Sequence, residues 1–301
     1  MQRPDTQRRL AMALMWVIPA LWTVNYLVAR NARGVIEPYT LAFGRWLIAG
    51  IILATIARRE LWSERRAVLA VWYDYVVLGT LGMMICGAWV YLGAKTTQAV
   101  NIALIYAAAP VLIALGSVFW LKERMGATQQ VGVAVALAGV VHVVVRGQWT
   151  SLASVQWVVG DLWIILATVS WAGYAMLQKV WPSGLSATAR LACICAGGVL
   201  VLLPFTMWEA GLPTTPPWTW HALALTVAVA LLPGLGAYWI YGWAQKILGA
   251  SRVAMTLYLG PLYGAVATYL VLDEPLGWHH LAGAALILPG VYLVTRAPAK
   301  L

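Results

Sequence analysis

Two arginines lie within strongly apolar stretches of the sequence, where a charged side chain has few favourable surroundings. Arg45 lies in the run FGRWLIAG, and Arg190 lies in the run LSATARLACICAGG. An arginine at the centre of a membrane-spanning helix costs about 2.5 to 3.5 kcal/mol, and a guanidinium pairs well with a carboxylate. Neither arginine lies at the centre of its run, so two interpretations stay open. Each reaches lipid headgroups or a neighbouring helix end, or each acts as a gate or as the partner of a substrate carboxylate.

Aromatic and amide side chains share one helical face in two places. Trp22, Asn25 and Tyr26 have the spacing i, i+3 and i+4, which puts them on one stripe of a helix. A second stripe, at i, i+3 and i+7, has similar groups: Trp171, Tyr174 and Gln178. Such rings stack on flat apolar molecules, and an amide in hydrocarbon needs a polar partner. The stripes therefore face either a water-filled cavity or a hydrogen-bonded helix contact.

The sequence has no arrangement typical of an enzyme, a metal site or a nucleotide site. The four histidines lie toward the ends of apolar runs, without a partnered Ser or Asp. Cys193 and Cys195 form a C-x-C pair that lacks the further ligands of a metal site. No Walker A sequence occurs, and no Asp or Glu lies in the middle of an apolar run. We expect no catalytic residue, no metal and no cofactor.

The composition indicates a membrane protein. Of 301 residues, 62% are hydrophobic and 10% are charged, and the mean hydropathy is +0.79, whereas a soluble domain has about 25% charged residues. Apolar stretches of about 17 to 25 residues, each long enough to cross a bilayer as a helix, follow one another. Ten spans are predicted, at residues 10–30, 39–57, 71–93, 99–121, 128–145, 158–179, 186–206, 220–243, 251–272 and 278–295.

A repeated motif divides the chain into halves. LKERMG at residues 121–126 recurs as LDEPLG at residues 272–277. Around it, five residues recur at the same spacing: Pro110, Glu123, Gly126, Gly132 and Gly139 correspond to Pro261, Glu274, Gly277, Gly283 and Gly290. Upstream, further pairs match with small gaps: Trp22 with Trp171, Arg45 with Arg190, Trp89 with Trp239, and Tyr91 with Tyr241. The chain therefore predicts two five-helix repeats, at residues 1–147 and 148–301.

The basic residues predict how these halves lie in a membrane. Because five is odd, the second half enters from the opposite face, and equivalent loops lie on opposite sides. Lys and Arg concentrate in cytoplasmic loops. With the N-terminus inside, the Lys and Arg fall on the cytoplasmic side except for four outside and two within spans: Arg30, Arg33, Lys95 and Arg146, and Arg45 and Arg190. This distribution predicts cytoplasmic N- and C-termini in the inner (plasma) membrane. Because the orientation accounts for the net charge of +10, we expect no nucleic-acid partner.

This five-plus-five pattern resembles the drug/metabolite transporter superfamily, in particular its EamA family, over essentially the whole chain. The residues that carry the resemblance are ALWTVNYLVAR at 20–30, FGRWLIAG at 43–50, and the two P-x12-E-x2-G-x5-G-x6-G blocks. The resemblance implies an all-α integral membrane protein, with ten transmembrane helices as two inverted five-helix repeats. It also implies a central cavity between the first, third and fourth helices and their equivalents, with aromatic amino acid exporters of the YddG type as a close analogue.

Side chains deep in the spans, or on the helices that the resemblance assigns to the cavity, are the candidates for substrate contact. In addition to Trp22, Asn25, Tyr26, Trp171 and Tyr174, they are Met83, Tyr106, Trp163, Tyr238 and Tyr258. For each of these side chains, the alternative to substrate contact is packing against protein or lipid. Pro110 and Pro261 each remove a backbone hydrogen bond, so they are either hinges of moving helices or static kinks.

These features predict a secondary transporter rather than an enzyme. We expect it to export small metabolites, in particular amino acids with aromatic or other apolar side chains, by alternating access. Its partners are then a small-molecule substrate and the lipid bilayer, and it acts as a monomer or homodimer. Two alternatives stay open, a passive channel or facilitator for other small solutes or drugs, and an intramembrane enzyme.

Overall fold

The chain folds as a bundle of helices. The computed structural model describes residues 4–272 and 275–296. Helices make up 82% of these residues, and no strand occurs among them. The first half contains these elements: α1 (Pro4–Leu14), α2 (Val17–Asn31), α3 (Pro38–Ile56), α4 (Arg58–Ser63), α5 (Arg65–Ala70), α6 (Trp72–Gly79), η1 (Thr80–Trp89), α7 (Val90–Ala94), α8 (Ala99–Tyr106), α9 (Ala109–Phe119) and α10 (Ala127–Val144).

The second half begins with a short 3₁₀ helix. Its elements are η2 (Trp149–Ser154), α11 (Val159–Val180), α12 (Ala187–Ala210), α13 (Trp220–Val229), η3 (Ala230–Ala237), α14 (Tyr238–Leu248), α15 (Ala250–Ala254), η4 (Met255–Leu259), α16 (Gly260–Leu272) and α17 (Trp278–Arg296). The segments η1 and η3 are π-helical, whereas η2 and η4 are 3₁₀-helical. The two π-helical segments have similar places in the two halves. η1 ends at Trp89, and η3 ends two residues before Trp239, the equivalent of Trp89.

Within residues 4–272 and 275–296, eight helices, rather than ten, are long and apolar enough by themselves to cross a membrane. They are Pro38–Ile56, Trp72–Ala94, Asn101–Phe119, Ala127–Val144, Val159–Val180, Ala187–Ala210, Trp220–Leu248 and Trp278–Thr295. The other two predicted spans, 10–30 and 251–272, are divided into shorter pieces. The prediction of an all-helical membrane fold is confirmed, and that of ten spans is confirmed for eight.

Prolines lie at the interruptions. Pro19 has no N–H to give to the carbonyl of Met15, and the helix breaks between α1 and α2 at that point. Pro110 lies in the first turn of α9, directly after the break that follows α8, and Pro261 lies in the first turn of α16, after η4. Pro233 lies inside the π-helical η3. Each of these four prolines therefore lies in or beside an interruption of regular α-helix.

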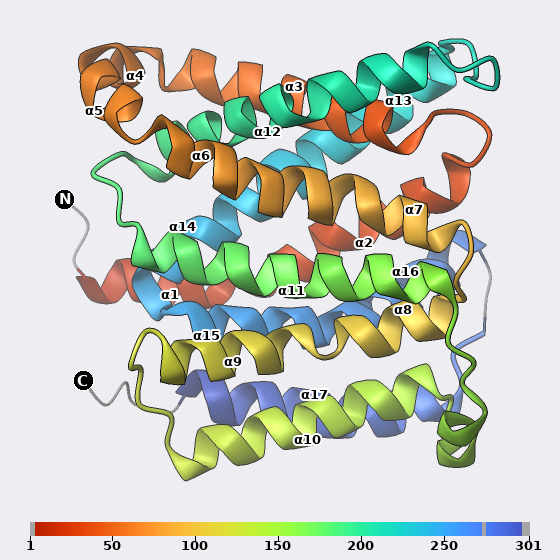
Figure 1. Ribbon diagram of the computed structural model, residues 1–301. Coiled ribbons are helices and arrows are strands. Elements are labelled where there is room, and N and C mark those ends of the chain that lie inside the picture. Colours follow the sequence, from red (N-terminus) through yellow and green to blue (C-terminus); the bar gives the residue numbers. More distant parts are fainter. Residues whose placement is uncertain (1–3, 273–274, 297–301) are drawn as a thin grey trace.

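The two halves run in opposite directions. In Figure 1, α2, α6–α7 and α10 run away from the end of the bundle where α1 begins, whereas their equivalents α11, α13–α14 and α17 run toward it. The start of α1 and the end of α17 consequently lie at the same end of the bundle. This is the arrangement expected of two inverted repeats.

The repeated glycines lie where equivalent helices touch. A Cβ on Gly132 of α10 would come within 2.7 Å of the carbonyl oxygen of Gly290 of α17, and one on Gly139 within 2.9 Å of that of Gly283. Because Gly132 corresponds to Gly283 and Gly139 to Gly290, the two contacts are related by the repeat symmetry. Small residues let the backbones approach this closely.

Carboxylates at helix ends join the halves in the same reciprocal way. Glu209, near the end of α12, accepts hydrogen bonds from the backbone N–H groups of Tyr39 at 3.0 Å and Thr40 at 2.7 Å, in the first turn of α3. Glu60, just beyond the end of α3, accepts two hydrogen bonds of 2.6 Å from the N–H and hydroxyl of Ser186 at the start of α12. Each helix of the pair is therefore capped by an acid from the end of the other.

The repeated glutamate of the LKERMG motif has a similar place. Glu123 accepts a hydrogen bond of 3.0 Å from the hydroxyl of Ser251 in α15, which belongs to the other half. Its counterpart Glu274 lies outside the described residues. The connection between α9 and α10, to which Glu123 belongs, lies at the end of the bundle where α1 begins (Figure 1).

Candidate functional site

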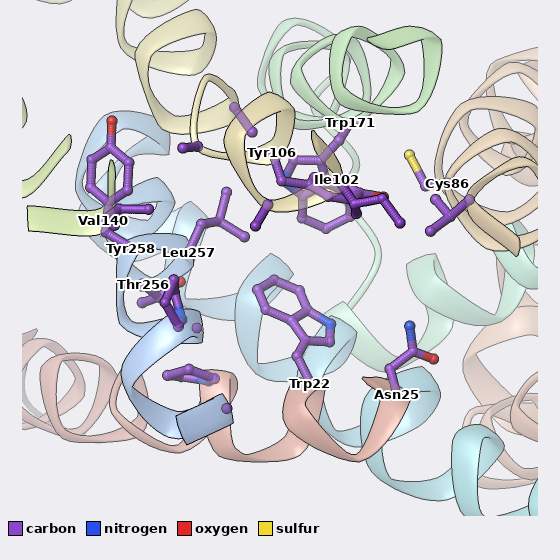
Figure 2. Close-up of a pocket in the computed structure, with 18 of the residues that line it drawn as sticks. Trp22, Asn25, Cys86, Ile102, Tyr106, Val140, Trp171, Thr256, Leu257 and Tyr258 are labelled. Atoms are coloured by element: carbon purple, nitrogen blue, oxygen red, sulfur yellow. The ribbon is translucent and has the colours of Figure 1, made fainter. Parts of the chain in front are cut away.

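A cavity of about 420 Å³ lies between the two halves. Its walls come from both repeats, namely from α2, α3, η1, α7, α8, α9 and α10, and from α11, α14, η4 and α16. Figure 2 shows Trp22, Asn25, Tyr106 and Trp171 around the open space. Along α7 the lining reaches Ala94, the last residue of that helix, so the cavity extends from the middle of the bundle toward the end opposite the termini (Figure 1). Its volume suits a small metabolite.

Aromatic rings from equivalent positions meet at the inner part of the cavity. Trp22 of α2 and Trp171 of α11 lie edge to face, with ring centroids 5.5 Å apart. Tyr238 of α14 lies 5.3 Å from Trp171 and 6.3 Å from Trp22. Trp171 is 6% exposed, whereas Trp22 is half-buried and presents more of its ring to the cavity. This part of the cavity offers ring faces and edges to a flat apolar group.

A polar group lies beside these rings. The side-chain oxygen of Asn25 accepts hydrogen bonds from the hydroxyl of Tyr91 at 2.9 Å and from Nη1 of Arg45 at 3.3 Å. The guanidinium carbon of Arg45 lies 4.5 Å from the ring centroid of Trp46 and 5.6 Å from that of Tyr238. These cation–π contacts hold the charge against ring faces. Among the described residues that line the cavity, Arg45 is the only one with a charged side chain.

The equivalent arginine in the second half makes a different set of contacts. Nη2 of Arg190 donates to the carbonyl oxygens of Gln178 at 2.9 Å and Trp181 at 2.6 Å, at the end of α11. The space beside it, between α12 and α14, has a volume of only about 20 Å³. Arg190 thus binds carbonyl groups at the end of a neighbouring helix, which is one of the two interpretations of the sequence, while Arg45 lines the cavity. The two equivalent sites therefore differ in the space beside the arginine, about 420 Å³ at Arg45 and about 20 Å³ at Arg190.

Most of the sequence-based candidates line the cavity. They are Trp22, Asn25, Tyr106, Trp171, Tyr238 and Tyr258, together with Arg45 and Pro261. Three candidates lie behind the lining in this structure. Met83 is fully buried, Tyr174 is 1% exposed and stacks on Trp171 at 5.4 Å, and Trp163 packs edge to face on Trp89 at 5.1 Å. Pro110 and Arg190 also lie outside the lining, and the side chain of Tyr26 is outside the described part of the chain.

Sequence reasoning missed Tyr91 as a partner of Asn25. The repetition of Trp89 and Tyr91 as Trp239 and Tyr241 was a signal that could have found it. The π-helical η1 precedes Tyr91 and turns the helix by a different angle per residue than an α-helix does. A regular helical wheel therefore cannot give the face on which Tyr91 lies. Cys86, within η1, lines the cavity for the same reason.

Comparisons with known proteins agree with this architecture. The chain is 28% identical to the uncharacterized transporter YyaM of Bacillus subtilis (strain 168), over 89% of this chain and 87% of that protein. It is 29% identical to a probable terminal-alkyne amino-acid exporter of Streptantibioticus cattleyicolor, over 72% of this chain and 71% of that protein. A solved crystal structure with 18% sequence identity has a TM-score of 0.75 and covers 95% of this chain and 96% of its own, which shows the fold alone.

The family model gives the assignment. The EamA-like transporter family matches twice in succession, at residues 9–145 and 158–296, and these two matches cover both repeats. The chain is therefore a multi-pass membrane transporter and not an enzyme. It belongs to the EamA-like transporter family.

Proposed function

We propose that this protein exports small amphiphilic metabolites, in particular amino acids with aromatic or other apolar side chains, by alternating access. The observation that carries the proposal is the cavity of about 420 Å³ between the two halves, which Trp22, Trp171 and Tyr238 line. Beside Arg190, the equivalent of Arg45, the space is only about 20 Å³. A carrier of this kind exchanges which end is open while its substrate stays near the middle. The amino-acid exporter of Streptantibioticus cattleyicolor supports the substrate class.

The membrane arrangement is part of the same proposal. We place ten spans in the bilayer, with residues 10–30 and 251–272 as the broken first and ninth spans, in repeats 1–147 and 148–301. Both termini are on the cytoplasmic side of the plasma membrane, because the loop with Arg58, Arg59, Arg65 and Arg66 lies at the end where α1 begins (Figure 1). The cavity then opens to the outside, in the conformation from which an exporter releases its substrate.

Counterflow in proteoliposomes tests the transport mechanism. Purified protein is reconstituted with an unlabelled aromatic amino acid inside, and uptake of the labelled form is measured. A carrier gives saturable, trans-stimulated uptake, because loaded transitions carry solute in both directions. Flux that rises linearly with concentration, without trans-stimulation, identifies a passive channel instead, and no flux across a broad metabolite panel contradicts the proposal.

A further inference from the structure

The charge of Arg45 has no anionic partner in the described part of the protein. Arg45 is 4% exposed, and no carboxylate of the described residues forms an ion pair with it. A buried guanidinium without a counter-ion is unfavourable in a membrane protein, and such groups generally mark a substrate pathway. The contacts that Arg45 does make, to Asn25 and to two ring faces, are with neutral groups.

The guanidinium also has unused hydrogen-bonding capacity. It has five N–H donors. Nη1 donates to Asn25 at the long distance of 3.3 Å, and Nε is buried without any hydrogen-bond partner. Gly234 leaves room beside it, since a Cβ there would come within 3.3 Å of Nε. An arginine held in this way by ring faces keeps donors for a group that is planar, anionic and able to accept two hydrogen bonds.

The lining is otherwise unsuited to a second charge. Among the described lining residues there is no Asp or Glu that could pair with an ammonium group. The oxygen of Asn25 already accepts two hydrogen bonds. The aromatic part begins directly beside Arg45, because Tyr238 contacts both the guanidinium and Trp171. The site is therefore built for one negative charge attached to an apolar body.

We propose that Arg45, positioned by Asn25 and Tyr91, binds the carboxylate of the transported solute, and that the apolar part of the solute lies against Trp22, Trp171 and Tyr238. Recognition requires the carboxylate and does not require an α-amino group. The solute class is therefore apolar monocarboxylates, among which amino acids with aromatic side chains form one subset. The inference rests on the proposed function, since it names the chemistry that the transporter's cavity recognises.

Calorimetric binding to the detergent-purified, wild-type protein tests the claim with four related probes. 3-Phenylpropanoate has the carboxylate, 3-phenylpropanamide has the same shape without charge, phenethylamine has only the ammonium, and phenylalanine has both charges. We expect the amide and the amine to bind at least about tenfold more weakly than the acid, because they lack the charge-assisted hydrogen bonds. We expect phenylalanine to bind no more than about tenfold more tightly than the acid. Equal binding of acid and amide, or no binding of the acid, overturns the inference.

Variants then assign the effect to Arg45. Arg45→Gln should weaken binding of the acid about tenfold while leaving the amide unchanged, and Arg45→Lys should give an intermediate affinity. The matched control is Arg33→Gln, which removes an exposed positive charge that hydrogen-bonds to the carbonyl of Ala94 near the cavity. It should change neither affinity. An Arg45→Gln protein that melts like the wild type and binds the acid equally well contradicts the proposal.

The two proposals fail separately. If the acid binds in an Arg45-dependent manner but no solute shows counterflow, the carboxylate site stands and the transport proposal is wrong. If other solutes show saturable counterflow while the acid does not bind, the transporter stands and the carboxylate site is wrong. The wild-type probe series decides the second point even if the Arg45 variants do not fold.

Discussion

At the scale of single residues, the arginines at two equivalent positions make different contacts. Arg45 and Arg190 are both buried and both repeat in the sequence, yet one faces the cavity and the other binds the end of α11. The sequence predicted that both would need polar partners, because burial of a charge requires them. It could not say which arginine faces a cavity, since that depends on which end of the bundle is open.

Trp22 is the ring best placed to contact a solute without supporting the fold, because it is half-buried in the lining while Trp171 is almost fully buried. We expect Trp22→Ala to weaken solute binding about tenfold and Trp22→Phe to weaken it less, since one ring contact contributes about 0.5 to 1.5 kcal/mol. Binding affinity and melting temperature are measured together. Unchanged affinity in Trp22→Ala would reassign this ring to packing.

Gly264 in α16 offers a direct test that the cavity is the binding site. A Cβ at Gly264 has no neighbour within 4 Å, because this glycine lines the open space. Gly264→Leu should therefore fill part of the cavity and lower transport at least about tenfold. Because Leu has the better helix propensity, the free energy of unfolding should stay the same or rise by up to about 1 kcal/mol. Gly184→Leu, also at an open position but away from the cavity, is the control. Full transport by Gly264→Leu would place the solute elsewhere.

At the scale of helices, the sequence predicted the positions of elements better than their irregularities. The apolar runs predicted the positions of the eight long helices, and Pro110 and Pro261 lie directly after interruptions of regular α-helix, since proline lacks the N–H of a regular helix. The π-helical segments η1 and η3 were not predicted. Because η1 holds Cys86 and precedes Tyr91, it affects the face of the helix on which each of these two residues lies.

The helices α6 and α12 touch backbone to backbone, since a Cβ on Gly79 would come within 2.2 Å of the backbone nitrogen of Gly198. We expect Gly79→Ala to lower stability by about 1 to 3 kcal/mol, because neither backbone can move aside without strain. Gly173→Ala in α11 is the matched control, since its Cβ would meet only Leu81 at 3.8 Å. Melting in detergent measures both. Equal melting temperatures would show that the two helices separate easily.

The two glutamates that cap helices differ in burial, so they should contribute differently to the stability of the protein. Glu209 is 2% exposed and accepts from two backbone N–H groups of α3 and from the hydroxyl of Thr40, whereas the bonds between Glu60 and Ser186 are exposed. We expect Glu209→Ala to cost about 1 to 3 kcal/mol, because buried donors are left unpaired. Glu60→Ala should cost less than about 1 kcal/mol, since water replaces the carboxylate. A larger loss for Glu60→Ala than for Glu209→Ala in thermal unfolding would contradict this order.

At the scale of the whole molecule, the repeated motif predicted the inverted halves because an odd number of passes reverses the second copy. The contacts of Gly132 with Gly290 and of Gly139 with Gly283 agree with that symmetry. The open end of the cavity could not be predicted in the same way. Two inverted halves can open at either end, and the two conformations have similar free energies. The same sequence is therefore compatible with both conformations.

The membrane orientation has its own test, independent of transport. Ser63, at the end of α4, and Ser154, at the end of η2, are both exposed and lie at opposite ends of the bundle (Figure 1). In a background without Cys86, Cys193 and Cys195, a membrane-impermeant thiol reagent added outside intact cells should label Ser154→Cys and leave Ser63→Cys unlabelled until the membrane is opened. In the proposed orientation, the basic loop around Ser63 keeps that end of the bundle on the cytoplasmic side, because Lys and Arg oppose translocation. Replacing Arg58, Arg59, Arg65 and Arg66 by Glu should therefore reverse or mix the labelling, and an unaltered pattern would show that some other part of the chain sets the orientation.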